Sequence, residues 1–218
     1  MPSVYPISLL LEGRLCVVVG GGKVAERKVQ ALLQAGGRVR VVSPVATDEI
    51  ADLAAAGRVD WRPRDGCEAD LTDAFLVILA TDDAALNAQL AAAADAAGKL
   101  VNAVDQPADC NFHVPAAVRR GPVVLTVATG GGSPALAKRM RQELEAVFGP
   151  EYGELAALME RLRPEVLATL ATQPERAAAW ERILDSAAFE LLRQGKPAEA
   201  EASAREAAGL RPGTSDRR

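Results

Sequence analysis

A glycine-rich segment is the part of this sequence best suited to contact a phosphate group. Residues 19–25 read VGGGKVA and fit the pattern G-x-G-x-x-A. Gly20 would permit a tight turn, Gly22 would let a pyrophosphate approach the backbone, and Ala25 would let a helix pack closely on a strand. A helix that begins here would also present free N–H groups to the phosphates. The pattern predicts a dinucleotide site, with a purely structural turn as the alternative.

The residues after the next expected strand bear on the choice of dinucleotide. The strand 38–42 is followed by Ser43, Pro44 and Val45, where folds of this kind usually have an Asp or Glu that binds the ribose 2′-OH of NAD. No arginine that could hold a 2′-phosphate follows directly, although Arg40 lies within the strand. These residues therefore do not decide whether the protein binds NAD or NADP.

Two further strands end in polar side chains. Thr81 and two aspartates follow the strand 75–80, and Asp105 follows the strand 100–104. The carboxyl ends of strands line the ligand crevice of an open α/β sheet, so we expect the Thr81 region to contact the cofactor. At least one of the two aspartates should cap the next helix. Asp105 is interpreted equally well as a general base or as a turn-forming residue.

Basic residues gather around a second glycine-rich turn. Residues 129–133 read TGGGS and precede an expected helix, for which Ser133 fits the N-cap. A local basic cluster in an acidic protein has two interpretations. It could bind a polyanionic small molecule, or it could be a solvated helix face, which is slightly favoured. The candidate residues are Arg119, Arg120, Lys138, Arg139 and Arg141.

Short apolar runs alternate with segments of helical period in the first half of the chain. This alternation predicts an α/β fold, a Rossmann-like doubly wound parallel sheet. Strands are expected at 15–19, 38–42, 58–62, 75–80 and 100–104, and helices at 24–35, 48–56 and 84–97.

The pattern changes after Asp105. Two strands at 112–118 and 122–129 and a helix at 134–148 predict a small α+β segment, and the chain then becomes helical with a break expected at Pro164. The run Val123–Val127 is too apolar for an exposed edge strand, which predicts a homodimer. The expected parts are an NAD-binding domain at 1–110, a middle dimerisation segment at 111–149, a C-terminal helical domain at 150–210 and a disordered tail at 211–218.

The composition excludes several classes of protein. The chain has 218 residues, a net charge of -4, 49% hydrophobic and 25% charged residues, which is typical of a soluble globular protein. No apolar run is long enough to span a bilayer, no signal peptide is expected, and the acidic balance argues against nucleic-acid binding. One histidine and three scattered cysteines predict no metal site and indicate the reduced thiols of a cytoplasmic protein.

Four segments together resemble a known family. Residues 20–28, 80–83, 102–105 and 129–134 are similar in order and spacing to the precorrin-2 dehydrogenase / sirohydrochlorin ferrochelatase family, the N-terminal module of siroheme synthase. The resemblance extends to about Leu192. It implies NAD-dependent oxidation of precorrin-2 to sirohydrochlorin in siroheme or cobalamin biosynthesis, with insertion of Fe²⁺ as a further activity. It also implies a homodimer that exchanges its middle segments between subunits.

The resemblance implies roles for individual residues. Asp105 would be the catalytic acid/base, and the polycarboxylate tetrapyrrole substrate would give the five basic residues a purpose. Thr129 stands where some members have a serine that can be phosphorylated, and the methyltransferase domain of the multifunctional enzyme is expected to be absent. The resemblance implies that NAD is held at Gly22, Lys23, Val24, Pro44 and Val45, and the residue patterns described above add Gly20, Ser43 and Thr81.

Two other classes of protein account for fewer of these residues. A non-catalytic NAD-sensing regulatory domain would explain the glycine-rich loop but neither Asp105 nor the turn at 129–134. A short-chain dehydrogenase needs a Tyr-x-x-x-Lys pair, and neither Tyr5 nor Tyr152 has a lysine four residues on.

Overall fold

The computed structural model describes residues 4–210 and divides into two compact units, Met1–Val114 and Pro115–Arg218. The expected disordered tail at 211–218 lies outside the described residues. No helix in the described part of the chain is long and apolar enough to cross a membrane.

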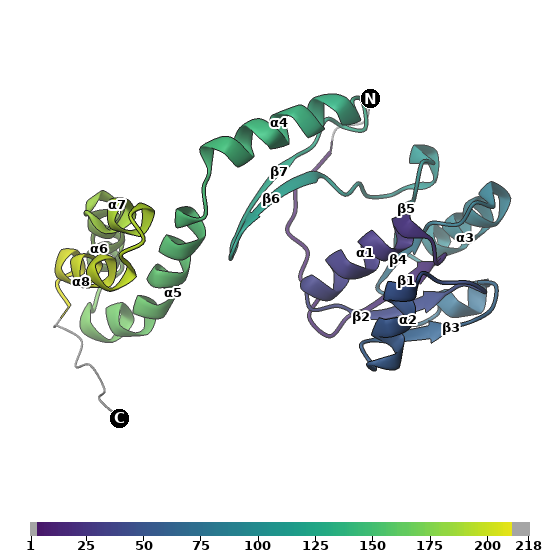
Figure 1. Cartoon of the computed structure of the whole chain (residues 1–218), viewed down its shortest axis with the longest axis horizontal. Helices are drawn as coiled ribbons and strands as arrows, with labels where there is room; N and C mark the ends of the chain where they lie inside the picture. Colours follow the sequence, from purple (N-terminus) through teal and green to yellow (C-terminus); the bar gives the residue numbers. More distant parts are fainter. Residues whose placement is uncertain (1–3, 211–218) are drawn as a thin grey trace. The chain divides into compact units, whose positions relative to one another are not determined.

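A parallel sheet of five strands forms the centre of the first unit (Figure 1). The strand order is β3-β2-β1-β4-β5, and all four neighbouring pairs run parallel. This arrangement confirms the predicted doubly wound fold. The strands are β1 (Leu15–Val19), β2 (Arg38–Val42), β3 (Val59–Arg62), β4 (Leu76–Leu79) and β5 (Leu100–Ala103).

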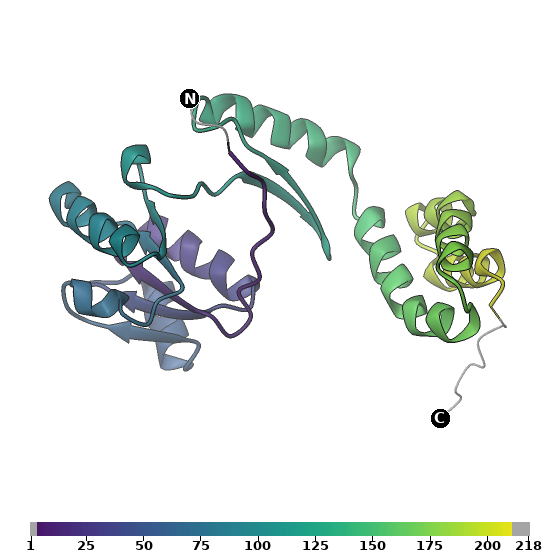
Figure 2. The same cartoon turned by 180° about the vertical axis from the view of Figure 1, so that it is seen from behind.

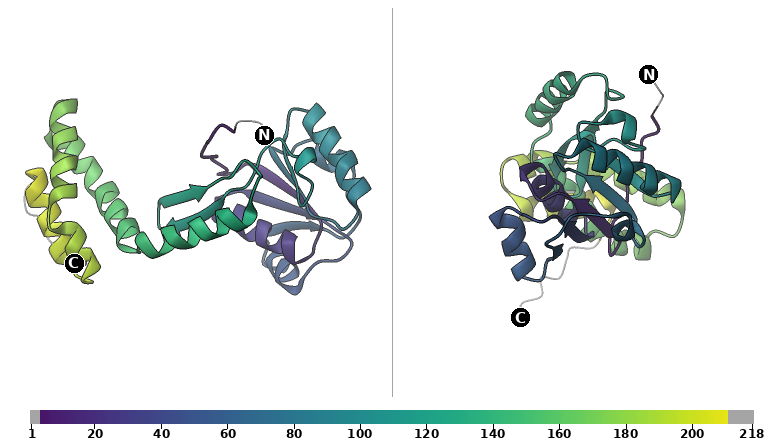
Figure 3. Two further views of the ribbon diagram at one scale, coloured as in Figure 1. Left: turned by 90° about the horizontal axis from the view of Figure 1, so that it is seen from above. Right: turned by 90° about the vertical axis from the view of Figure 1, so that its right-hand side faces the viewer.

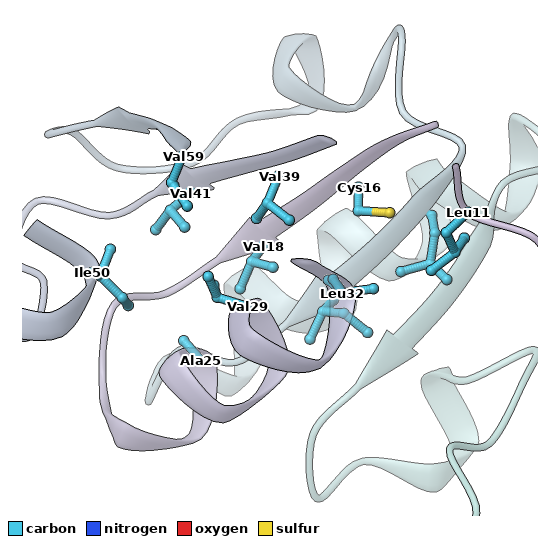
Figure 4. Packing of buried hydrophobic residues seen from close by; sticks show 12 residues of the cluster. Leu11, Cys16, Val18, Ala25, Val29, Leu32, Val39, Val41, Ile50 and Val59 are labelled. Carbon is cyan, nitrogen blue, oxygen red and sulfur yellow. The ribbon is translucent and has the colours of Figure 1, made fainter. Parts of the chain in front are cut away.

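Helices cover both faces of this sheet (Figures 1 and 2). Alternate residues of β1 point to opposite faces, so Cys16 and Val18 pack with α1 and α2, while Val17 and Val19 pack with α3. Figure 4 shows the first of these clusters, in which Val29 and Ile50 lie over the strands. The elements are α1 (Lys23–Gln34), α2 (Asp48–Ala55), α3 (Ala84–Ala96) and the short 3₁₀ helices η1 (Glu68–Leu71) and η2 (Pro107–Asp109).

The strand order reverses between β1 and β4. From β1 the chain winds outward through β2 to β3, and it then crosses back to form β4 on the other side of β1. In open α/β sheets, ligands bind outside the carboxyl ends of the strands at this switch point. The loops after β1, β4 and β5 therefore line the place where a cofactor is expected.

The second unit begins with an antiparallel hairpin, β6 (Ala116–Arg120) and β7 (Val123–Val127), which is followed by α4 (Pro134–Val147) (Figure 3). Ser133 caps α4, as expected, by accepting a hydrogen bond from the N–H of Leu136 at 3.2 Å. The prediction that a strand begins at Phe112 is wrong. The side-chain amide of Asn102 donates to the Phe112 carbonyl at 3.0 Å, so this stretch is held against β5 instead of pairing with β7.

Four helices complete the second unit. The break predicted at Pro164 is wrong, because α5 continues through it. Pro164 is exposed, so water can solvate the carbonyl that loses its hydrogen bond, and Leu162 and Val166 stay buried on the other face. The helices are α5 (Glu151–Thr169), α6 (Gln173–Asp185), α7 (Ala188–Arg193) and α8 (Pro197–Ala208).

Candidate cofactor and catalytic site

Gly20 lets the loop after β1 pass close to the loop after β4. Its N–H donates to the Val42 carbonyl at 3.0 Å, and its φ is +117°, a conformation that only glycine adopts readily. A Cβ atom here would collide with the Ala80 carbonyl oxygen. Gly20 is therefore required by the packing of the loops themselves, whether or not a ligand is present.

Gly22 differs, because a Cβ atom there would meet nothing within 4 Å. It is the N-cap of α1, with φ -79° and no side-chain cap. Within residues 4–210, the N–H groups of Lys23, Val24 and Ala25 have no acceptor. Open space beside uncapped helix donors fits the phosphates of a dinucleotide. The Lys23 side chain itself pairs with Glu26, with an Nζ–Oε2 distance of 2.9 Å.

The loop after β2 contacts the glycine-rich loop. A Cβ atom on Gly21 would collide with the Val45 carbonyl, and the N–H of Thr47 donates to the Gly21 carbonyl at 3.0 Å. The Ser43 hydroxyl donates to the Val45 carbonyl at 2.7 Å, while Pro44 and Val45 are exposed. The structure thus brings Ser43–Val45 beside Gly20–Val24.

Arg40 is engaged within the sheet. Its Nε donates to Asp60 on β3 at 2.7 Å, and this hydrogen bond holds the pKa of the Asp60 carboxyl below its usual range. The Trp61 indole on the same strand donates to the Ser43 carbonyl at 3.0 Å. These contacts stabilise the end of β2, where the ribose of a bound dinucleotide is expected.

Thr81 is held by a residue that the sequence did not reveal. The Thr81 hydroxyl donates to Asn87 Oδ1 at 2.7 Å, and Asn87 Nδ2 donates back to the Thr81 carbonyl at 3.0 Å. Asn87 lies on α3 and is only 2% exposed. The carboxylate of Asp83 accepts from the N–H groups of Ala85 and Leu86 at 3.0 Å each, which confirms the predicted cap. A lone asparagine among the alanines and leucines of this helix was the available clue.

Asp105 lies in a pocket of about 320 Å³ at the switch point. Its carboxylate is exposed and accepts no hydrogen bond within residues 4–210, and Pro107 lacks the N–H that an Asx-turn would need. Its φ is +60°, a conformation that Asp tolerates better than most residues but that still costs free energy. The pocket is lined by Val24, Ala80, Thr81, Asp82, Ala84, Asn87, Val104, Asp105 and Gln106.

The five basic residues all belong to the second unit. Arg120 donates from Nε to the Phe148 carbonyl at 2.8 Å and therefore secures the end of α4. Arg139 pairs with Glu143 at 3.1 Å, and Arg141 pairs with Glu145 at 2.6 Å. Lys138 and Arg119 are exposed.

The turn before α4 uses the hydroxyl of Thr129 as a structural group. This hydroxyl donates to the Ser133 carbonyl and accepts from the Ser133 N–H, both at 3.2 Å. These two bonds close the loop that presents Ser133 to the first turn of α4.

Other reactive side chains are scattered. Among residues 4–210, no three His, Cys, Asp or Glu side chains come together in a way that could hold a metal ion. The three cysteines are free thiols. Burial raises the pKa of the Cys16 thiol to about 11. His113 is exposed and precedes β6.

Comparison with known proteins identifies the family. Residues 7–116 match a family described as NAD(P)-binding, and residues 151–207 match the sirohaem synthase dimerisation region. The chain belongs to the precorrin-2 dehydrogenase / siroheme synthase family. It is 42% identical over 196 residues to a siroheme synthase of Pseudomonas aeruginosa, covering 90% of this chain and 42% of that protein.

A second relative and a solved structure support the same family. The siroheme synthase of Thioalkalivibrio sulfidiphilus is 41% identical over 192 residues, which cover 88% of this chain and 39% of that one. This chain thus spans about two fifths of these siroheme synthases. The solved structure of SirC, a precorrin-2 dehydrogenase, matches with a TM-score of 0.78 and 28% identity over 93% of this chain and all of the other.

Proposed function

We propose that this protein is an NAD-dependent precorrin-2 dehydrogenase, which oxidises precorrin-2 to sirohydrochlorin in siroheme or cobalamin biosynthesis. The observation that carries the proposal is the pocket at the switch point. It combines the carboxylate of Asp105, which has no partner among residues 4–210, with Val24 of the glycine-rich loop and with Thr81. A base and a dinucleotide loop in one pocket are what removal of a proton and a hydride requires.

NAD would lie across the carboxyl ends of the strands. Gly20 would permit the turn of the loop, and Gly22 would admit the pyrophosphate. The N–H groups of Lys23 and Val24 would donate to it, and the loop Ser43–Val45 would border the ribose. Thr81, clamped by Asn87, would form the wall beside the nicotinamide. When bound, NAD⁺ supplies an acceptor for a hydride.

Asp105 would act as the general base of the oxidation. A carbon–hydrogen bond of the macrocycle breaks with loss of a hydride, and the carboxylate of Asp105 takes the proton that the macrocycle loses as its new double bond forms. The carboxylate is exposed to the pocket, and no hydrogen bond among the described residues competes for it. The strained backbone at Asp105 is the kind of feature that gathers at functional sites.

The polyanionic substrate gives the basic residues of the second unit a role. Arg119, Lys138 and Arg139 have exposed side chains, which can bind peripheral carboxylates without losing a buried partner. Arg120 and Arg141 would mainly support the segment that carries the others. These three contacts would set substrate affinity, and the residues of the pocket would carry out the oxidation.

The protein would work as a cytoplasmic homodimer. Residues 1–110 would bind the cofactor, and the middle segment 111–149 would form the dimer together with the helical domain 150–210, which contains the match to the sirohaem synthase dimerisation region. On α4, Leu136, Met140 and Val147 are 49%, 42% and 66% exposed, and Val124 on β7 is 44% exposed. These side chains lie in the expected dimerisation segment. A second copy of the chain would cover them and remove their apolar surface from water.

The proposal includes a second activity, the insertion of Fe²⁺ into sirohydrochlorin. It rests on the similarity to siroheme synthases. Metal insertion also requires removal of protons from the ring, and Asp105, proposed above as the base of the oxidation, would accept them here as well. Fe²⁺ would enter as a substrate.

The experiment is an anaerobic assay of NAD reduction with precorrin-2. We expect turnover by the unaltered protein, and a loss of roughly 10²-fold or more in Asp105→Asn, because the amide keeps the shape but cannot accept the proton. NAD affinity of the variant should be nearly unchanged. Full turnover by Asp105→Asn would show that the residue only forms a turn, and binding of NAD without any oxidation would favour the NAD-sensing domain.

A further inference from the structure

Lys28 is a cationic side chain that the proposed reaction leaves without a role. It lies on α1, four residues after Val24, so the two share one face of the helix. Val24 lines the pocket that contains Asp105. Lys28 thus lies one helical turn beyond a residue that lines this pocket.

The environment of Lys28 is unusual for a lysine. The side chain is half-buried, yet within residues 4–210 its ammonium has no salt bridge and no hydrogen bond. Burial and the neighbouring Arg27 lower the pKa of Lys28, whereas Cys110 and Asp105 act in the opposite direction. A partly desolvated cation without a direct partner costs free energy, and a bound anion would relieve that cost.

We propose that Lys28 binds a peripheral carboxylate of the tetrapyrrole and so anchors the substrate beside Asp105. The loop 104–112 packs on the same core cluster as α1, because Val104 and Phe112 contact it, so this loop and α1 lie on one face of the sheet. A carboxylate held at Lys28 would fix one edge of the macrocycle beside the base. The inference rests on the proposed function and adds a substrate contact within the first unit.

The test measures the binding of sirohydrochlorin by fluorescence and the steady-state kinetics of the oxidation of precorrin-2. For Lys28→Met we expect the Kd for sirohydrochlorin and the KM for precorrin-2 to rise about tenfold, as for loss of a charge-assisted hydrogen bond. The kcat and the Kd for NAD should stay within about twofold, and Lys28→Arg should restore binding, because it keeps the charge. Methionine preserves the aliphatic part of the lysine side chain. If Lys28→Met does not fold, Lys28→Gln replaces it in the same measurements.

Lys99→Met is the matched control. Lys99 belongs to the same unit, and its Nζ donates to the Thr72 carbonyl at 2.7 Å, before the amino end of β5. The same loss of charge there should leave sirohydrochlorin affinity unchanged. Unchanged affinity in Lys28→Met, or a fall in kcat with normal affinity, would overturn the inference. Because product binding needs no turnover, this result is separate from failure of the dehydrogenase assay.

Discussion

The two units of this protein differ in how completely each buries its own apolar surface. In the first, every residue of β4 and four of the five in β1 are buried between helices on both faces. In the second, β7 buries only Val127, and α4 buries no residue. A parallel sheet covered on both faces completes its own core, whereas a hairpin with a single helix leaves apolar side chains in water. The first unit therefore completes its core around the cofactor loop by itself, while the exposed apolar side chains of the hairpin and α4 are those that the proposed homodimer would cover.

This contrast predicts that cofactor binding can be removed without disturbing either core. Gly22→Leu should weaken NAD binding at least about 100-fold, or ~2.7 kcal/mol, because the side chain would occupy the space of the pyrophosphate. The variant should fold, since the φ of Gly22 suits any residue and a Cβ atom there meets nothing. Calorimetric titration with NAD and a thermal melt would measure both properties. Unchanged NAD affinity in a folded Gly22→Leu protein would contradict the assignment of this loop as the pyrophosphate site.

The exposed face of α4 offers the second test. Met140→Glu should weaken the dimer by roughly 100-fold or more, because it would place a charge within an apolar interface. Analytical ultracentrifugation across micromolar concentrations would measure the change. Leu10→Glu is the control in the first unit, where Leu10 is 84% exposed and a charge should be tolerated. A wild-type protein that is already monomeric, or equal effects of the two variants, would contradict the comparison.

The smallest predicted effect is on the free energy of unfolding, and it concerns the buried carboxylate of Asp70. Asp70 is 2% exposed, and Arg64 and the Cys67 N–H, at 2.8 and 3.0 Å from Oδ2, hold the pKa of Asp70 at about 2. Because this pKa is depressed, the stabilisation is present above the ordinary pKa of Asp and is lost as the pH falls toward 2. Asp70→Asn should cost about 2 kcal/mol at pH 7 and less at pH 3.

Urea denaturation at the two pH values would measure this difference. The exposed Asp73 supplies the control, and Asp73→Asn should change the unfolding free energy little at either pH. An equal effect of Asp70→Asn at pH 7 and pH 3 would show that the ion pair is not the cause.

Local sequence determined the elements of the first unit. The apolar runs of β1, β2, β4 and β5 and the periodic helices between them appeared within a residue or two of the predicted positions. Asp83 and Ser133 cap the helices as predicted, because a cap depends on residues only two or three positions apart. The glycine-rich loop and the strand that ends before Asp105 were visible for the same reason.

Only the tertiary structure decided which distant side chains meet. The clamp of Asn87 on Thr81 and the packing of α1 and the 104–112 loop on one core cluster depend on how α3 and α1 pack, which local patterns do not encode. The break predicted at Pro164 is absent because the burial of Leu162 and Val166 offsets the cost of a proline within the helix. The strand predicted from Phe112 is absent there because Asn102, ten residues earlier, holds the Phe112 carbonyl. Short-range patterns specify elements, whereas these four outcomes depend on contacts between elements.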